Sequence, residues 1–328
     1  MHGSARRQRR RGRARAPLTT LAAGVLLALC AAGLLACGGA TSGGGTGGAS
    51  GGTPPTATVT APAEPSAGAS VSPSATPTTA TETMRLSVYF LRPVMSVKAG
   101  QAVAEGPFVA TAHRWVPATK AAAAAALRAL FLGPVARERA IGMRSALPAG
   151  TSLRSVALAD GTATVDLAMS ASPGGRRVAL DRLAQVVYTV TQFPTVKAVR
   201  FLLDGKPIDS YGGVDLSKPV GRADFEAVTP PILVESPAPF DTVTSALRVS
   251  GTADVFEATF QARLVTGTGA HLARKTVTAS SGSGTRGTFS FSMPFATTAG
   301  TVSLSVWEVS MEDGSTLHEA TIPLTVGG

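Results

Sequence analysis

The chain has 328 residues, of which 44% are hydrophobic but only 5% aromatic and 15% charged, a balance typical of β-rich modules joined by loose segments. Its net charge of +10 is misleading, because seven arginines and no acidic residue precede Cys37; without them, the 30 basic residues fall to 23 against 20 acidic ones. This near balance argues against nucleic-acid binding, since such proteins carry their excess charge on the folded domain.

The N-terminal segment, residues 1–36, has the pattern of a bacterial lipoprotein signal peptide. An uncharged stretch from Leu18 to Ala36 follows the arginines and ends in Leu34-Leu35-Ala36-Cys37-Gly38, which matches the lipobox. We therefore expect cleavage before Cys37 and lipid attachment to its sulfur. The alternative is an uncleaved transmembrane anchor, since about 20 apolar residues can span a bilayer. Both alternatives place the rest of the chain outside the cytoplasm.

The next segment, residues 37–83, is dominated by Gly, Ser, Thr, Ala and Pro, and we expect it to be a disordered linker. As a coil it would reach roughly 35–40 Å, which suits a tether between membrane and folded domains. Only two cysteines are present, and Cys30 lies within the signal segment. After cleavage, disulfides and cysteine-based metal sites are therefore excluded.

Residues 84–226 predict an α+β domain. Strands are indicated by alternation in Leu86–Phe90, by Phe108–Val116 and by the apolar run Val196–Leu203. Asp160-Gly161, between Leu153–Ala159 and Thr162–Leu167, predicts a hairpin with a type I′ turn. A second Asp-Gly turn follows at Asp204-Gly205.

Two helices are expected in this domain. The first covers Lys120–Leu132, capped by Thr119 and ended by Gly133-Pro134, and the second covers Arg177–Gln192. The order of elements favours a small sandwich with the helices on one face of the sheet.

Residues 230–328 show no helical period and predict an all-β, immunoglobulin-like sandwich. Seven short runs are candidate strands: Ile232–Val234, Leu247–Thr252, Thr259–Val265, Leu272–Val277, Thr288–Met293, Val302–Val309 and Ala320–Val326. Because the usual inter-sheet cysteine pair is missing, Trp307 is the expected anchor of the core.

Several segments of both regions resemble known bacterial domains. The first region resembles the GerMN domain of sporulation and spore-germination lipoproteins, through Val88–Leu91, Ala126–Leu130 with Gly133-Pro134, Ala146–Thr151, Ala163–Leu167, Leu183–Pro194 and Val199–Pro207. The second resembles the immunoglobulin-like domain often paired with it, through Ile232–Pro237, Leu247–Ala253, Phe256–Phe260 and Phe289–Phe291. The resemblance implies an envelope lipoprotein without catalytic residues, of a kind also found in actinobacteria.

The residues themselves give little indication of catalysis. His113, His271 and His318 lack the spacing of metal ligands and are expected at the surface or at strand ends. Gly282–Gly287 fits a dinucleotide-binding pattern, but the strand-like sequence after it favours a hairpin loop. We predict no catalytic, cofactor-binding or metal-binding residue, so Cys37, as the lipidation site, is the one functional residue assigned.

Two smaller points remain open. Asp160 and Asp204 could form a carboxylate pair for acid–base chemistry, although aspartate before glycine is more typical of a turn. Tyr211, beside Gly212-Gly213, could belong to a recognition loop or could fill a gap in the packing.

The sequence thus favours a non-catalytic envelope lipoprotein, bound to the membrane through its lipid, that presents two modules to other envelope proteins or to peptidoglycan. A small-molecule-binding or substrate-delivery lipoprotein is the alternative, and it requires a deep pocket between the domains. An unrecognised hydrolase is a third possibility.

Overall fold

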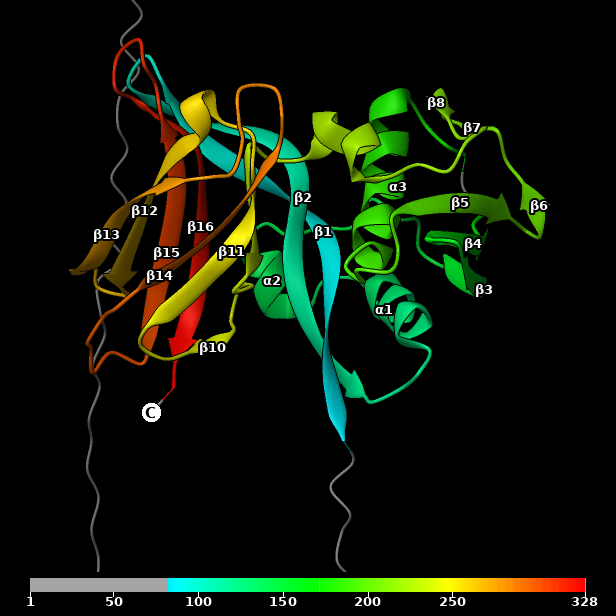
Figure 1. Ribbon diagram of the computed structural model, residues 1–328, viewed down its shortest axis with the longest axis horizontal. Helices are drawn as coiled ribbons and strands as arrows, with labels where there is room; N and C mark the ends of the chain where they lie inside the picture. The colour runs from blue at the N-terminus through cyan, green and yellow to red at the C-terminus, as the bar shows by residue number, and fades with distance from the viewer. Residues whose placement is uncertain (1–81, 171, 328) are drawn as a thin grey trace, which may run out of the picture. The chain divides into compact units, whose positions relative to one another are not determined.

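The computed structural model describes residues 82–170 and 172–327 (Figure 1). The expected signal segment, Cys37 and all but the last two residues of the expected linker lie outside these ranges. Across the described part of the chain, no helix combines the length and the apolar character needed to cross a bilayer.

A long antiparallel hairpin opens the described part. Strands β1 (Thr83–Lys98) and β2 (Gln101–Pro117) have 16 and 17 residues, far more than the short strands expected from alternation. Tyr89 and Phe90 are neighbours in sequence, yet both are at most 1% exposed, so the middle of β1 is covered on both faces. This double burial hides the alternation that would otherwise reveal the full length of the strand.

Three helices lie next to this hairpin: α1 (Ala122–Phe131), α2 (Ala136–Ala140) and α3 (Arg176–Val190). The predicted hairpin forms as β3 (Ser152–Ala159) and β4 (Thr162–Ala168), and its turn residues Asp160 and Gly161 have positive φ of 49° and 74°. Strands β5 (Ala198–Leu203) and β6 (Lys206–Pro207) complete a sheet of order β3-β4-β5-β6, in which α3 connects the parallel pair β4 and β5.

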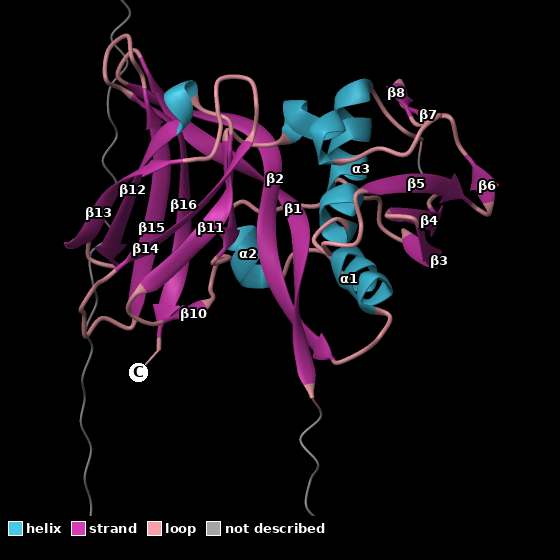
Figure 2. Ribbon diagram, viewed as in Figure 1, coloured by secondary structure: helices cyan, strands magenta, loops and turns pink. Residues whose placement is uncertain are grey.

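The expectation that both helices cover one face of a single sheet is wrong. The β1–β2 hairpin does not join the β3–β6 sheet, and α3 lies between these two layers (Figure 2). Eleven of the 15 residues of α3 are buried, including Leu180, Val186 and Val190. A helix that is apolar around most of its circumference is stable only with partners on several sides.

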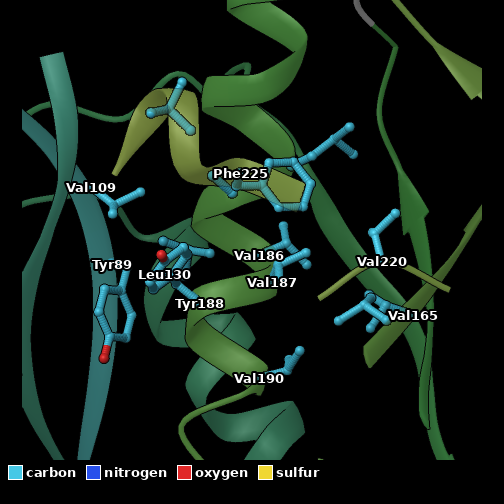
Figure 3. Close-up of a cluster of buried hydrophobic side chains, with 14 of the residues drawn as sticks. Tyr89, Val109, Leu130, Val165, Val186, Val187, Tyr188, Val190, Val220 and Phe225 are labelled. Carbon is cyan, nitrogen blue, oxygen red and sulfur yellow. The ribbon is translucent and has the colours of Figure 1, made fainter. Parts of the chain in front are cut away.

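The core of the α+β region forms where hairpin, helices and sheet meet. Figure 3 shows Tyr89 and Val109 from the hairpin approaching Leu130, Tyr188 and Phe225 of the helical layer. Strands β7 (Ser210–Tyr211) and β8 (Val214–Asp215) and the 3₁₀ segment η1 (Arg222–Val228) close this core. Tyr211 is only 4% exposed, so it fills a gap in the packing and is not part of a recognition loop.

The immunoglobulin-like region contains all seven predicted strands and a short additional one, β10 (Thr242–Val243). The seven are β9 (Ile232–Ser236), β11 (Leu247–Ala253), β12 (Thr259–Thr266), β13 (His271–Thr278), β14 (Gly287–Met293), β15 (Thr301–Val309) and β16 (Thr316–Val326). Sheet β14-β11-β9 packs on the strands β13-β12-β15-β16, and the core contains Phe260, Phe289 and Phe291 with ring centroids 4.9–6.5 Å apart.

Trp307 does not anchor this core, contrary to the sequence prediction. It pairs with Gln261 on β12, whose neighbours Phe260 and Ala262 point into the core, so Trp307 lies on the outer face of the sheet. There the guanidinium groups of Arg263 and Arg274 cover its ring at 5.1 and 5.5 Å. Two cations therefore contribute to the burial of Trp307 on this face.

One sheet runs through both regions. Its order is β13-β12-β15-β16-β1-β2, and β1 pairs antiparallel with β16 where Met95 lies opposite Glu319. The part of the β1–β2 hairpin around Met95 thus belongs structurally to the immunoglobulin-like region. The part around Tyr89 covers the helices of the α+β region. The two regions are joined by β-structure as well as by the chain between them.

Candidate functional site

Charged and aromatic side chains meet where the two regions adjoin, and we call this set the interdomain seam: Tyr89, Tyr188, Arg222, Glu226, Glu235 and Arg286. Arg222, at the start of η1, donates from Nη1 to Glu235 Oε1 at 2.7 Å. The Tyr89 hydroxyl donates to the same carboxylate oxygen at 2.5 Å. The Arg222 guanidinium lies 5.4 Å from the Tyr89 ring centroid and 4.6 Å from that of Tyr188, close enough for cation–π attraction.

The electrostatics of this cluster fix its protonation. Burial raises the pKa of Tyr89 far above its ordinary value, and the charge of Glu235 adds to the effect. Burial works to lower the pKa of Arg222, but Tyr89 and Glu235 outweigh it, so the pKa rises. Tyr89 is therefore a hydrogen-bond donor to Glu235 and not a phenolate.

A second clasp comes from the loop between β13 and β14. Arg286 Nε donates to both carboxylate oxygens of Glu226, at 2.9 and 3.0 Å, and Arg286 Nη2 donates to the Pro230 carbonyl at 3.0 Å. This loop contains the glycine pattern Gly282–Gly287, and β14 begins at Gly287, so a strand and not a helix follows the pattern. The prediction of a hairpin loop is wrong, because β13 and β14 belong to different sheets and the loop connects these sheets. The loop holds the two regions together.

A cleft of about 510 Å³ lies beside these clasps. Its lining residues come from both regions: Tyr188, Arg222, Ala223, Glu226, Thr252, Asp254, Gly284, Thr285 and Arg286. It occupies the position that the small-molecule alternative requires. Its two arginines, however, are already paired with Glu226 and Glu235, so a bound anion would have to compete with these carboxylates.

Two of the three histidines also tie the regions together, although the sequence suggested surface or strand-end positions. His113 Nδ1 lies 2.7 Å from Asp241 Oδ2, and its side chain is only 6% exposed. Burial works to raise the pKa of Asp241, but the contact with His113 outweighs it, so the pKa is lowered. His271, at the start of β13, is exposed as expected.

His318 is held between two carboxylates from different regions. Its Nε2 lies 3.2 Å from Glu105 on β2, and its Nδ1 lies 3.1 Å from Glu308 on β15. The hydrogen bond from His318 is the main cause of the lowered pKa of Glu308. For Glu105, burial acts to raise the pKa, but Lys98 and His318 lower it overall. Within residues 82–170 and 172–327, no group of three or more His, Cys, Asp or Glu side chains is arranged to hold a metal.

The two aspartates considered as a carboxylate pair, Asp160 and Asp204, lie in separate turns. Asp160 and Asp204 both occupy left-handed turn positions, with φ of 49° and 50°. Because β4 and β5 run parallel, the turn before β4 and the turn after β5 lie at opposite ends of the sheet, so these aspartates do not form a pair. Cys37 lies outside the described residues.

Sequence reasoning did not find the seam. Tyr89 and Glu235 are 146 positions apart in the chain, and Arg222 and Tyr89 are 133 apart. No local pattern marks such partners, because each residue taken alone is an ordinary core tyrosine, surface arginine or strand glutamate. The arrangement defines a class of protein: an α+β domain and an immunoglobulin-like sandwich that share a sheet and are clasped by ion pairs.

Two family models match the chain. The model described as sporulation and spore germination matches residues 87–209, and the model described as an immunoglobulin-like domain of bacterial spore germination matches residues 231–315. The chain therefore contains both of these domains, one in each of its two regions.

Three solved structures are similar to part of the chain. A candidate lipoprotein from Clostridium perfringens is 24% identical, over 45% of this chain and 93% of that one, with a TM-score of 0.30. The tandem GerMN domains of the sporulation protein GerM from Bacillus subtilis are 23% identical, over 43% and 46% of the two chains, with a TM-score of 0.33. The first GerMN domain of GerM is 21% identical, over 40% and 98%, with a TM-score of 0.26. A search of curated proteins gave no match.

Proposed function

We propose that this protein is a non-catalytic envelope lipoprotein that presents a rigid two-domain body as a binding or scaffolding module, in sporulation, germination or envelope assembly. The observation that carries this proposal is the shared sheet, in which β1 pairs with β16. A surface that extends over both regions keeps its shape only if the regions do not move relative to each other.

Three ion pairs between the regions also support the proposal of a rigid two-domain body. Arg222 with Glu235, Arg286 with Glu226, and His113 with Asp241 each join one region to the other. Partly buried ion pairs add little net stability, but they favour one geometry over others, because any other arrangement leaves a charge without its partner. We infer that they maintain the relative orientation that a partner recognises.

Membrane attachment through Cys37 is the second part of the proposal. Metabolic labelling with an alkyne analogue of palmitate should label the wild-type protein in the membrane fraction, and Cys37→Ser should abolish both labelling and membrane retention. Cys30→Ser, at the chain's other cysteine, is the matched control and should leave both unchanged. An unlabelled wild-type protein in the cytosol would contradict the proposal.

The partner class can be tested directly. Chemical crosslinking in intact cells, followed by purification of the tagged protein from membranes, should recover envelope proteins in a reproducible set. Cosedimentation with purified cell walls tests peptidoglycan as the partner. If neither experiment gave binding above that of an unrelated lipid-anchored protein, a scaffolding function would be untenable.

The interdomain cleft favours one alternative, a small-molecule-binding or substrate-delivery lipoprotein. Its volume of about 510 Å³ is large enough for a ligand of drug-like size. Thermal-shift measurements with purified muropeptides provide the test. If the alternative holds, muropeptides should raise the melting temperature of the wild type and not of Thr285→Trp, which fills the cleft; no shift in the wild type would count against it.

A further inference from the structure

We propose that the furrow between the start of α1 and the free edge of β3 binds an extended acidic segment of a partner protein, which adds to the β3–β6 sheet as a new strand. This inference rests on the proposed binding function and assigns to it a surface and a class of partner. We call this surface the β3 furrow, lined by residues 120–124 and 128 of the α1 segment and by 153–156 and 158 of β3.

The edge of β3 is available for pairing. This strand ends the sheet order β3-β4-β5-β6 and pairs only with β4. In the described ranges, the backbone of Ser152–Ala159 forms no hydrogen bond to any other element. Six of its eight residues are exposed, although α1 lies beside the strand and forms the other wall of the furrow. Such an edge is a template for main-chain pairing with another chain.

Many natural sheets block strand addition at their edge strands, and β3 carries such a block only at one end. Its register shifts between Leu153 and Ser155, which places an irregularity at Arg154. The following five residues, Ser155–Ala159, pair regularly with β4 and contain no charge and no proline. Charges, prolines and bulges are the usual means of blocking an edge, and their absence leaves this part competent to accept a strand.

The space beside the edge fits a peptide. The β3 furrow has a volume of about 400 Å³, and its helical wall consists mainly of the alanines 121–124, whose small side chains leave room. A second hollow shares Leu158 with it and continues to the Asp160-Gly161 turn. At about 3.3 Å per residue, an eight-residue strand spans roughly 26 Å, so a partner segment of similar length can lie along β3.

The positive charge of the furrow favours an acidic partner segment. Lys120, Arg128 and Arg154 line the furrow, and no acidic side chain does. Arg154 contacts Asp166 at 3.3 Å and Asp204 at 3.8 Å, whereas no ion pair of Lys120 or Arg128 occurs in the described part of the chain. Cations along a groove attract and orient an acidic partner. Leu158, 56% exposed, offers one apolar contact in the same furrow.

A polypeptide fits these features better than another polyanion. An anionic wall polymer would be attracted by the cations but could not use the unpaired N–H and C=O groups of the β3 edge. Main-chain hydrogen bonds supply the affinity in strand addition, while pockets for alternate side chains supply the selectivity.

The test uses the full-length protein in detergent and a pool of synthetic eight-residue peptides that alternate aspartate or glutamate with valine, isoleucine, threonine or tyrosine. Binding is measured by fluorescence anisotropy, and hydrogen exchange reports the amides of β3. We expect the pool to bind, to slow exchange within Ser152–Ala159, and to bind at least tenfold more weakly to the double variant Lys120→Glu, Arg128→Glu.

The matched control is Lys206→Glu, Lys218→Glu, which makes the same change of charge away from the furrow. Both of these lysines are exposed, and Lys206 lies on β6 at the opposite edge of the same sheet. The control should bind the pool as the wild type does. Circular dichroism verifies that both variants are folded.

Four results would overturn the inference. One is equal weakening by the control variant, another is binding without slowed exchange in β3, and the third is the absence of binding to the acidic pool. Displacement of the pool by polyphosphate but not by an acidic peptide would also overturn it and indicate a general polyanion site. These failures would leave membrane attachment and envelope crosslinks intact, so they are distinguishable from failure of the proposed function.

Discussion

The two regions of this protein differ in charge as much as in fold. Residues 84–226 contain 18 basic and 10 acidic side chains, whereas residues 230–328 contain 5 basic and 8 acidic ones. The near balance of charge from Cys37 onward therefore hides a basic α+β region joined to an acidic β-sandwich. Opposite charges on the two sides of an interface favour correct pairing, and the contact of Arg85 and His113 with Asp241 follows this pattern.

The regions also differ in how their cores are built. The α+β core surrounds a helix that is covered on several sides, and the sandwich core consists of two sheets that enclose a phenylalanine cluster. Because β1 pairs with β16, we expect these two cores to unfold together. The following four predictions test how strongly the regions depend on each other.

The largest effect is expected from Phe260→Ala, in the sandwich core. Removing a fully buried phenylalanine costs about 3–5 kcal/mol. The two tryptophans of the chain report on the regions separately, since Trp115 lies on β2 and Trp307 on β15. Urea unfolding of Trp115→Phe and Trp307→Phe backgrounds should show coincident transitions that Phe260→Ala shifts together. Separate midpoints would show that the shared sheet does not couple the regions.

A smaller loss of stability is expected from Arg222→Met. Without the guanidinium, Glu235 keeps only the hydrogen bond from Tyr89 in the seam, and we expect a loss of about 2–3 kcal/mol in the free energy of unfolding. Arg200→Met, at an exposed position of β5, is the matched control and should change stability by less than about 0.5 kcal/mol. Equal effects of the two substitutions would mean that the clasp contributes nothing.

Acid should weaken the contacts between the regions. The pKa values of Asp241, Glu105 and Glu308 are lowered in the folded protein. A lowered carboxyl pKa stabilises the fold above the pKa of the unfolded chain, and this stabilisation is lost as the pH falls through the folded-state value. The melting temperature should therefore decrease below about pH 4.5. Asp241→Asn should lower stability at pH 7 and make the decrease shallower; an unchanged slope would contradict this assignment.

The smallest effect is expected from Arg274→Ala. One of the two guanidinium groups over Trp307 is then lost, with a cost of about 0.5–1 kcal/mol. The emission of Trp307, measured in a Trp115→Phe background, should shift to longer wavelength as water reaches the ring. Lys275→Ala, the next residue on β13, should leave the emission unchanged. An unshifted spectrum in Arg274→Ala would mean that Arg263 alone covers the ring.

Local sequence signals predicted much of the fold. The Asp160-Gly161 turn identified the β3–β4 hairpin because positive φ at both positions favours this dipeptide. All seven expected strands of the sandwich are present, since each is bounded by its own turn residues. The lipidation of Cys37 remains a prediction from the lipobox.

Tertiary structure alone decided the remaining features. Periodicity shows which residues share a face, but it does not show what covers that face, so the length of β1, the enclosure of α3 and the outward position of Trp307 could not be read locally. Within the seam, Tyr89 lies 146 positions from Glu235 and 133 from Arg222, and only the tertiary fold brings them together. Electrostatic and aromatic contacts between distant residues leave no periodic trace in the sequence, because their geometry exists only after both cores have formed.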